Sequence, residues 1–520
     1  MSTNSRTAAR ELVLSVDVGS TAVKVVAMTR EGQIAASASR HYASDSRRPG
    51  WVEQHPQQWW EGACAAIREC VANIGAAGGV LLGVSFSGHM SAPVLLGNDG
   101  HPVMPSIMIA DARSSEETAW LRQEYGETFV AMTGNMPIDA FTVSKLLWIK
   151  NNVPDALRRA ATLLFPKDFI RYRLSGHLLT DPTDAGNSLL YDAVSGRWSA
   201  ELIRELGLPE RLFPELQPSH GEAGRVSPEA AAATGLPEGL PVFTGAADMA
   251  CSQLGTGASE DGILAVTLST SGQAVMRVKG IVSEAVGKLT FHPSAIPGTL
   301  YAMGSIFTGG LGVDWAYRML SDKTQLQAED YEAIGILSRR MDGIPPGSDG
   351  LLFLPFLVGS GTPHFDAVDR ASWLGLATGQ PKELLLHSVM EGVAYNIREA
   401  MELFEASGYP AKRLHLGGGG SKNEVWSRMI GDVLDRPLAR LHHRDASAVG
   451  ASLLAGLGCG WYTSVDEAAR IVVSASEPAQ PNEGRAQAYG RIYGHYREVY
   501  HSLNRYYRAT AAENGLSEKL

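Results

Sequence analysis

The sequence predicts an α/β protein built from two domains, and three observations support this. The chain has 520 residues, which is more than a single hydrophobic core holds. β-rich apolar runs alternate with amphipathic helical patterns along most of its length. A β-rich run that breaks into a turn of glycine and hydroxyl residues occurs in each half, at 19–21 and again at 269–272. This repetition predicts a duplicated fold.

Composition and charge narrow the classes of partner. Hydrophobic residues make up 44% and charged residues 19% of the chain, as in ordinary globular proteins. The formal net charge of −10 argues against nucleic acid and anionic membranes as main partners. No apolar run approaches the ~18 residues that a membrane span needs. Residues 1–11 are polar and predict a disordered tail without a signal peptide.

The cysteines predict a reducing environment. Cys64, Cys70, Cys251 and Cys459 form no CxxC pair and no metal-ligand spacing. We therefore expect reduced, mostly buried thiols in a cytoplasmic protein.

The first turn, at the end of the β-rich run 12–18, carries phosphate-binding chemistry. Backbone N–H groups and hydroxyls in such a turn can bind phosphate oxygens, and Asp17 can hold a metal ion directly or through water. The β pattern resumes at 24–28, which predicts a hairpin. A plain turn is the alternative. The candidate phosphate ligands of this turn are Gly19, Ser20, Thr21 and Lys24.

The stretch 245–272 repeats this chemistry and adds an acid. Asp248 stands in a run of small residues that begins where the apolar strand Val242-Phe243 ends. A second β-rich run then breaks into Ser269-Thr270-Ser271-Gly272. A carboxylate shortly before such a turn predicts a base beside a phosphate group, with two ordinary surface turns as the alternative. The candidate phosphate ligands here are Thr270, Ser271 and Gly272.

Two glycine-rich segments in the second half predict a nucleotide site. Residues 304–310 precede a helix, and a strand at 412–416 enters Gly417-Gly418-Gly419-Gly420-Ser421-Lys422-Asn423 before the next helix. A helix N-terminus attracts anions and glycines admit a flat ring. The segment is not G-x-G-x-x-G, which disfavours a dinucleotide, and no Walker A sequence occurs either. The candidate ligands are Gly309, Gly310, Gly418, Gly419 and Asn423.

Polar residues at two strand ends in the first half are candidate substrate contacts. The buried strand predicted at 80–87 ends in Gly88-His89-Met90-Ser91, and a β-like run at 107–109 is followed by Asp111 and Arg113. Polar groups at the carboxyl ends of strands often line a ligand crevice in α/β sheets. Asp111 and Arg113 can hold sugar hydroxyls or pair with each other, and a lone histidine such as His89 is more often structural.

The chain then divides into three predicted parts after the tail. The Gly/Ser-rich link at 255–262 places the main boundary after residue 257. We expect a first domain at 12–257, a second at 258–460, and a helical cap of the second domain at 461–520.

Several motifs in a shared order resemble the FGGY carbohydrate kinases from about Leu12 to Arg505. They are Asp17-x-Gly19-Ser20-Thr21, Gly245-x-x-Asp248, Thr270-Ser271-Gly272, Glu391-Gly392-Val393-Ala394 and Gly418-Gly419-Gly420-Ser421-Lys422-Asn423. The resemblance implies a pair of ribonuclease-H-like domains of the actin/Hsp70 type, with a cleft for ATP and sugar between them. It implies sugar bound by the first domain and ATP by the second.

Within that family the motifs are most similar to those of xylulokinases, as in Trp51-x-Glu53-Gln54 and Pro166-Lys167-Asp168. Several segments depart from the pattern, among them Ile109-Ala110-Asp111-Ala112-Arg113, which stands where xylulokinases have Trp-Asn-Asp-Gly-Arg, and Ser269, which replaces the usual glycine of the second turn. His89-Met90-Ser91-Ala92 stands where xylulokinases have Gln-Met-His-Gly, so Ser91 replaces a sugar-contacting histidine. Gly359-Ser360-Gly361-Thr362-Pro363 stands where they have Gly-Glu-Arg-Thr-Pro. The resemblance implies D-xylulose, phosphorylated to D-xylulose 5-phosphate. Another ketose, a polyol or a linear hydroxy-carbonyl compound stays open.

The resemblance also implies a division of roles. Asp248 accepts the proton of the attacking hydroxyl, Asp17 orients Mg²⁺, and the phosphates of ATP lie between the two turns. Adenine lies against Gly419 and Asn423, while the sugar lies near residues 89–91, Asp111 and Arg113. The alternative from another class is a non-catalytic, actin/Hsp70-like protein that binds ATP as a switch. The sequence does not fix the oligomeric state, and a homodimer is one possible assembly.

Overall fold

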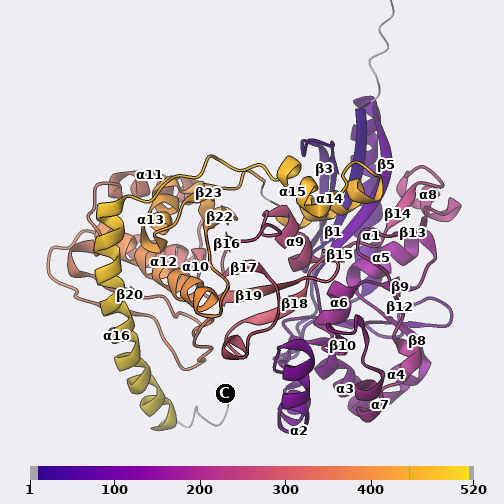
Figure 1. Cartoon of the computed structure of the whole chain (residues 1–520), viewed down its shortest axis with the longest axis horizontal. Coiled ribbons are helices and arrows are strands. Elements are labelled where there is room, and N and C mark those ends of the chain that lie inside the picture. Colours follow the sequence, from indigo (N-terminus) through magenta and orange to yellow (C-terminus); the bar gives the residue numbers. More distant parts are fainter. Residues whose placement is uncertain (1–9, 444, 514–520) are drawn as a thin grey trace, which may run out of the picture.

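The computed structural model describes residues 10–443 and 445–513 of the chain. Residues 1–9, most of the predicted tail, lie outside the described part, while Arg10 and Glu11 begin the first strand, β1 (Arg10–Val18). Two lobes, each built around a mixed β-sheet, lie side by side, with the earlier part of the chain in one and the later part mainly in the other (Figure 1).

The sheet of the first lobe surrounds β1. Its further strands are β2 (Ala22–Met28), β3 (Ile34–His41), β5 (Gly79–Gly88), β13 (Glu222–Arg225), β14 (Pro241–Phe243) and β15 (Ala246–Ala247). The order is β13-β14-β5-β1-β2-β3, with β15 also paired to β5. β1 runs antiparallel to β2 and parallel to β5. The predicted hairpin at the first turn is therefore present.

The sheet of the second lobe repeats this arrangement around β16. Its strands are β16 (Ile263–Leu268), β17 (Gly272–Val278), β18 (Thr290–Pro293), β19 (Leu300–Ile306), β22 (Arg413–Gly417) and β23 (Leu438–Arg440). The order is β18-β19-β17-β16-β22-β23, and β16 runs antiparallel to β17 and parallel to β22. Each lobe thus has an antiparallel hairpin on one side of its central strand and parallel strands on the other. The predicted duplicated α/β fold is confirmed.

Short strand pairs and helices complete the two lobes. The remaining strands are β4 (Glu53–Gln54), β6 (Val94–Gly97), β7 (Ser106–Ile107), β8 (Ala160–Leu164), β9 (Leu179–Thr180), β10 (Tyr191–Asp192), β11 (Arg197–Trp198), β12 (Glu215–Leu216), β20 (Leu352–Leu354) and β21 (Ser372–Leu374). The helices are α1 (Pro56–Ala76), α2 (Ser115–Thr133), α3 (Thr142–Asn152), α4 (Pro154–Arg159), α5 (Pro166–Ser175), α6 (Pro182–Asn187), α7 (Ala200–Glu205), α8 (Pro228–Thr234), α9 (Asp248–Gly255), α10 (Gly310–Ser321), α11 (Ala328–Met341), α12 (Lys382–Ala406), α13 (Glu424–Leu434), α14 (Ala446–Gly458), α15 (Val465–Val472) and α16 (Glu483–Glu513).

Each sheet is covered by an amphipathic helix whose apolar stripe the sequence shows. In the first lobe, Trp59 and Ile67 of α1 pack with strand residues such as Val25. In the second lobe, Val393 and Phe404 of α12 are fully buried in the core. Burial of these stripes, rather than helix propensity, stabilises the helices.

A third core joins the lobes, and α14 is its centre. Figure 1 shows α14 on the lobe that holds β1 and β5, far from α16. Its Val449 and Leu453 are buried together with Val13 and Met28 of the first sheet. α14 follows β23 in the chain but packs on the other lobe's sheet. The predicted second domain, 258–460, therefore contains a helix that covers the first sheet.

The two helices α9 and α14 cross at very short range. A Cβ atom built at Gly450 would lie 1.9 Å from the Cys251 carbonyl oxygen, and one at Gly255 would lie 2.0 Å from the Ala446 oxygen. Only glycine permits such an approach of two backbones. The crossing thus depends on one glycine in each helix.

The segment predicted as a single cap, 461–520, has two separate parts. α15 packs on α14 and α9, and the Tyr462 hydroxyl donates to the Arg30 carbonyl of the first lobe at 2.5 Å. α16 packs on the second lobe, where Tyr489 and Tyr496 are buried beside Tyr395. α15 is therefore attached to the first lobe, because α14 carries it there, while Ala475 and Ala479 already bridge to Leu441 and Leu438 of the second lobe. The boundaries at 257 and 460 stay predictions.

Within the described ranges, no helix is both long and apolar enough to cross a membrane. The four cysteines are unpaired; three are buried and Cys459 is half-buried.

Candidate active site

The strand register of the first sheet brings two acids together. Asp17 of β1 pairs with Ser87 of β5, and Ala246 of β15 pairs with the same Ser87 from the other side. Asp248 follows β15 directly and is the first residue of α9. Both carboxylates therefore lie at the carboxyl end of β5, where α/β sheets commonly bind ligands.

The Asp248 carboxylate is suited to accept a proton near neutral pH. Burial, with the charge of Asp17 as the second cause, raises the pKa of Asp248 to about 7. Its Oδ1 accepts a hydrogen bond from the amide of Met249 at 2.8 Å. The side chain nevertheless keeps partial exposure to solvent, so a substrate hydroxyl can reach it. A general base works best when its pKa lies near the working pH.

Asp17 has one oxygen engaged and one without a partner. Ser447, at the start of α14, donates to Asp17 Oδ2 at 2.7 Å. Asp17 Oδ1 is buried and has no hydrogen-bond partner among residues 10–443 and 445–513. Burial raises the pKa of Asp17. Beside it, Lys24 and Asp445 form an ion pair, so the predicted phosphate ligand Lys24 already has an acidic partner.

The turn at 19–21 is held by hydrogen bonds that its carbonyl groups accept. The hydroxyl of Tyr42 donates to the Gly19 carbonyl oxygen. The backbone amide of Tyr42 donates to the Thr21 carbonyl oxygen at 3.1 Å. Gln54 Nε2 donates to the Ser20 oxygen at 2.6 Å. Ser20 itself is exposed. The turn is therefore rigidly held while its tip stays open to solvent.

The turn at 269–271 joins β16 to β17 and rests on the start of α10. Gly309 and Gly310 donate their amides to the Thr270 and Ser269 oxygens at 3.1 and 2.6 Å. A Cβ at Gly309 would meet the Ser271 oxygen at 2.7 Å. Thr270 is exposed. Gly309 and Gly310 thus support the turn, whose exposed residues are Ser269 and the predicted phosphate ligand Thr270.

Two glycines of the run after β22 differ in their surroundings. Gly418 has a backbone conformation that favours glycine, and Gly419 lies beside open space. Gly418 has φ +80°, and a Cβ there would lie 2.3 Å from the Leu268 oxygen. Gly419 has no atom within 4 Å of its Cβ position. Asn423 caps α13 by accepting from the Trp426 amide at 3.1 Å, and it donates to Ser338 Oγ at 2.7 Å. Gly419 is the residue that leaves room for a flat ring.

His89 presents one unpaired acceptor. Its Nδ1 lies 2.9 Å from the Val18 carbonyl oxygen, and because a carbonyl only accepts, Nδ1 carries the hydrogen. The buried Nε2 has no partner within the described residues. Burial lowers the pKa of His89 to about 4, so the ring is neutral at pH 7. A substrate hydroxyl is the kind of donor that Nε2 lacks.

Met90 and Ser91, which follow His89, are buried. Ser91 adopts φ +68°, and its Oγ lies 3.5 Å from the Asn187 carbonyl oxygen. Ser91 therefore connects the end of β5 to α6 through a long hydrogen bond.

Asp111 and Arg113 pair with each other, which is the second of the two alternatives. The Arg113 side chain donates to Asp111 from Nε at 2.8 Å and from a terminal nitrogen at 2.6 Å. Its other terminal nitrogen donates to Glu53 at 2.6 Å, and its guanidinium lies 3.7 Å from the centre of the Trp51 ring. Asp111 also accepts from the Val52 amide. Both charged groups thus have strong internal partners, and their part in sugar binding stays a prediction.

Sequence reasoning missed a buried tyrosine and a buried charge cluster at this site. Tyr301 of β19 is fully buried, and its hydroxyl has no partner in the described part of the chain. Burial, with the charge of Asp248 as the second cause, raises its pKa. In the first lobe, buried Lys167 lies within 3.1 Å of three aspartates, Asp168, Asp181 and Asp184. The Pro-Lys-Asp motif contains part of this cluster, but no local pattern marks Tyr301.

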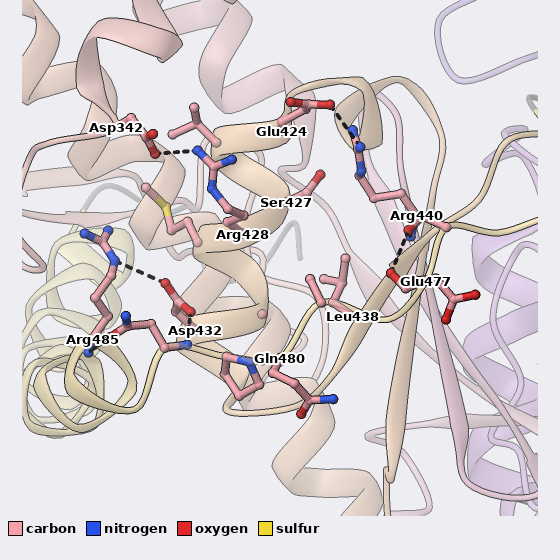
Figure 2. A pocket seen from close by; sticks show the side chains of 17 residues that line it. Asp342, Glu424, Ser427, Arg428, Asp432, Leu438, Arg440, Glu477, Gln480 and Arg485 are labelled. Atoms are coloured by element: carbon pink, nitrogen blue, oxygen red, sulfur yellow. Dashed lines mark hydrogen bonds and ion pairs between the residues drawn. The ribbon is translucent and has the colours of Figure 1, made fainter.

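A separate cavity of about 580 Å³ lies beside α13 and β23 (Figure 2). Its charged side chains pair with one another, as Arg428 with Asp342 at 2.6 Å and Arg440 with Glu424 at 2.9 Å. Its lining includes none of the predicted site residues. The cavity is therefore distinct from the pair of acids at β5.

Comparisons with known proteins agree with this geometry. Residues 12–255 match the model of the FGGY family of carbohydrate kinases, N-terminal domain, and residues 264–459 match that of the C-terminal domain. A xylulose kinase of Bacillus subtilis is 30% identical over 488 residues, which cover 94% of this chain and 96% of the relative. A glycerol kinase of Thermococcus gammatolerans is 27% identical, covering 92% and 95%. The crystal structure of xylulose kinase from Rhodospirillum rubrum superposes with a TM-score of 0.87 at 29% identity, covering 96% and 100%.

Proposed function

Because the chain belongs to the FGGY family of carbohydrate kinases, we propose that it transfers the γ-phosphoryl group of ATP to a hydroxyl of D-xylulose, giving D-xylulose 5-phosphate. The observation that carries the proposal is the Asp248 carboxylate, whose pKa is raised to about 7 beside Asp17 at the end of the paired strands. Because the members of this family are kinases, membership also argues against the alternative of a non-catalytic switch protein.

The proposed substrate rests on the relatives and on one acceptor. The relatives from Bacillus subtilis and Rhodospirillum rubrum carry the name xylulose kinase, at 30% and 29% identity. His89 Nε2 offers a neutral acceptor for a sugar hydroxyl and stands two positions before Ser91, which replaces the histidine of the xylulokinase pattern. Because a relative from Thermococcus gammatolerans is named glycerol kinase, another ketose, a polyol or a linear hydroxy-carbonyl compound is the second candidate.

The proposed roles follow from the chemistry of each group. Asp248 accepts the proton of the attacking hydroxyl as the new O–P bond forms and the bond from the γ-phosphorus to the β–γ bridging oxygen breaks, releasing ADP; such a base contributes ~10²–10⁴-fold. The phosphates lie between the exposed Ser20 and Thr270 of the two turns, and adenine lies beside Gly419. Preorganised donors of this kind stabilise the charge of the transferring phosphoryl group.

The unpartnered Asp17 Oδ1 fits a role toward Mg²⁺. Among the described residues no group of three or more His, Cys, Asp and Glu side chains could hold a metal, so phosphate oxygens and water would complete the coordination. When bound, the ion would neutralise phosphate charge. The cytoplasm, where ATP is available and thiols stay reduced, is the proposed location.

A substrate panel tests the proposal. Pentuloses, hexuloses and polyols are offered to the purified protein with ATP, and ADP release is followed by a coupled assay. We expect D-xylulose to give the highest kcat/KM, and Asp248→Asn to lose ~10²–10⁴-fold in kcat with modest changes in both KM values. A different preferred sugar would refute the substrate alone. Sugar-independent behaviour across the panel, or near-normal kcat in Asp248→Asn, would refute the mechanism.

A further inference from the structure

We propose that Asp181 is a buried hub that positions the base Asp248 through the side chain of Thr183 and the backbone of Ser219. Asp181, Thr183 and Ser219 are positioning residues, since none of them has to touch the substrate for this role. The proposal rests on the proposed function for the task of Asp248, but the contacts that carry it are independent of that task.

Asp181 gathers several donors around one carboxylate. Thr183 and Ser219 both donate their hydroxyls to Asp181 Oδ2, each at 2.7 Å. The Thr183 amide donates to the same oxygen at 3.2 Å, which caps α6. Lys167 Nζ lies 3.0 Å from Oδ1. Asp181, Thr183 and Lys167 are all fully buried, so this carboxylate is fixed and shielded from water.

The two hydroxyl residues hold the backbone that leads to the base. The Ala247 amide, which directly precedes Asp248, donates to Thr183 Oγ1 at 2.8 Å. The Gly245 amide donates to the Ser219 carbonyl oxygen at 2.8 Å. A Cβ at Gly245 would lie 2.4 Å from the Phe86 oxygen, so this end also presses against β5. The segment 245–247 is therefore held at both ends by residues that share Asp181 as acceptor.

The direction of the hydrogen bonds makes the hub specific. Because Thr183 Oγ1 accepts from Ala247, its single hydrogen must point to another acceptor, and Asp181 Oδ2 is that acceptor. The hydrogen bonds thus run in one direction, from Ala247 to Thr183 to Asp181, and end on a carboxylate that lies 3.0 Å from the Lys167 ammonium group. Hydrogen bonds to charged acceptors are shorter and stronger than neutral ones.

A shift of the Ala247 peptide moves Asp248, because the two residues are adjacent at the start of α9. Misplacing a catalytic group by about 1 Å can cost ~10²-fold in rate. Removing Asp181 or Lys167 itself would change the charge balance of the buried cluster and risks unfolding. Thr183 can be changed without altering that charge, and its side chain makes the bond to Ala247.

The test compares three variants of the full chain. Thr183→Val removes the hydroxyl at nearly constant volume, and Thr183→Ser retains it. Thr234→Val is the matched control, since Thr234 is equally buried in α8 and its hydroxyl bonds only locally: it donates to the Ala230 oxygen at 2.6 Å and accepts from the Leu236 amide at 3.3 Å. We expect Thr183→Val to lower kcat ~10–100-fold with both KM values within about twofold, Thr183→Ser to restore most of kcat, and Thr234→Val to keep it. Equal losses of kcat in Thr183→Val and Thr234→Val would overturn the proposal.

Amide hydrogen exchange gives a readout that needs no substrate. The peptide that contains residues 244–250 should exchange faster in Thr183→Val than in wild type. In Thr234→Val its exchange rate should equal that of wild type. Unchanged exchange in Thr183→Val refutes the hub whatever the kinetics. If wild type phosphorylates no sugar while exchange rises only in Thr183→Val, the clamp on 245–247 stands and the proposed function falls.

Discussion

At the scale of single residues, the site depends on two carboxylates kept close together. Burial and the neighbouring charge raise the pKa of Asp248 to about 7, well above the ~3.9 of an ordinary aspartate. Like charges disfavour joint ionisation, so Asp17 helps to hold a proton on Asp248 at mildly acidic pH. The neighbouring charge of Asp17 therefore contributes to the raised pKa of the base.

This arrangement predicts the pH dependence of the reaction. The base must be ionised to accept a proton, and its raised pKa means that protonation begins as pH falls toward 7 rather than toward 4. We expect kcat/KM to fall about tenfold per pH unit below ~7 and to level off above it. Thr270→Val, which changes a phosphate ligand and not the base, should use ATP less well but show the same pH midpoint. A flat profile down to pH 5 would contradict the base role of Asp248.

Residues near in sequence were predictable, whereas partners from distant segments were not. The turns at 19–21 and 269–272 were visible because each is a local hairpin with its own residues. Ser447, which donates to Asp17, lies 430 positions away, and Tyr301 stands in an ordinary strand pattern. The choice between sugar contact and mutual pairing for Asp111 and Arg113 depended on Glu53 and Trp51, which only the fold brings beside them.

At the scale of elements, the crossing of α9 and α14 is the tightest contact between the two halves of the chain. Each helix contributes a glycine whose missing side chain makes room for the other backbone. Asp248 begins α9, and Ser447, the partner of Asp17, lies at the start of α14. The crossing therefore ties both acids of the site to one packing contact.

A pair of glycine substitutions tests that contact. Gly450→Ala places a Cβ where the Cys251 oxygen lies at 1.9 Å, and overpacking of this kind costs about 1–3 kcal/mol or more. Gly494→Ala is the control, because that exposed position in α16 has no atom within 4 Å, and alanine there favours the helix by up to ~1 kcal/mol. Thermal unfolding should show a lower Tm for Gly450→Ala and no decrease for Gly494→Ala. Equal Tm values would mean that the helices separate at little cost.

At the scale of the whole molecule, neither lobe is made from one continuous stretch of chain. Val449 and Leu453 of α14 fill the core beside Val13 and Met28. The chain thus crosses to the second lobe after α9 and returns for α14 and α15 before α16. A fragment that ends at residue 257 lacks α14, which packs on one face of the first sheet.

A fragment experiment follows from this return. Residues 12–257 alone should expose the face formed by Val13, Met28 and Phe243, bind a hydrophobic dye and lack a cooperative melting transition. The same fragment joined by a long flexible linker to residues 445–473, which hold α14 and α15, should bind less dye and melt cooperatively. Cooperative melting of 12–257 without that addition would show that the first lobe is complete by itself.

The exchange of α9 and α14 also bears on how such a chain arises. Ala250 and Leu254 of α9 share their core with Val275 and Tyr301 of the second sheet, just as α14 completes the first. A protein of half this length, with one sheet and one such helix, would leave an apolar face bare as a monomer. Two copies would cover each other by trading helices, as domain-swapped dimers do. Fusion of the two copies would make the partner permanent.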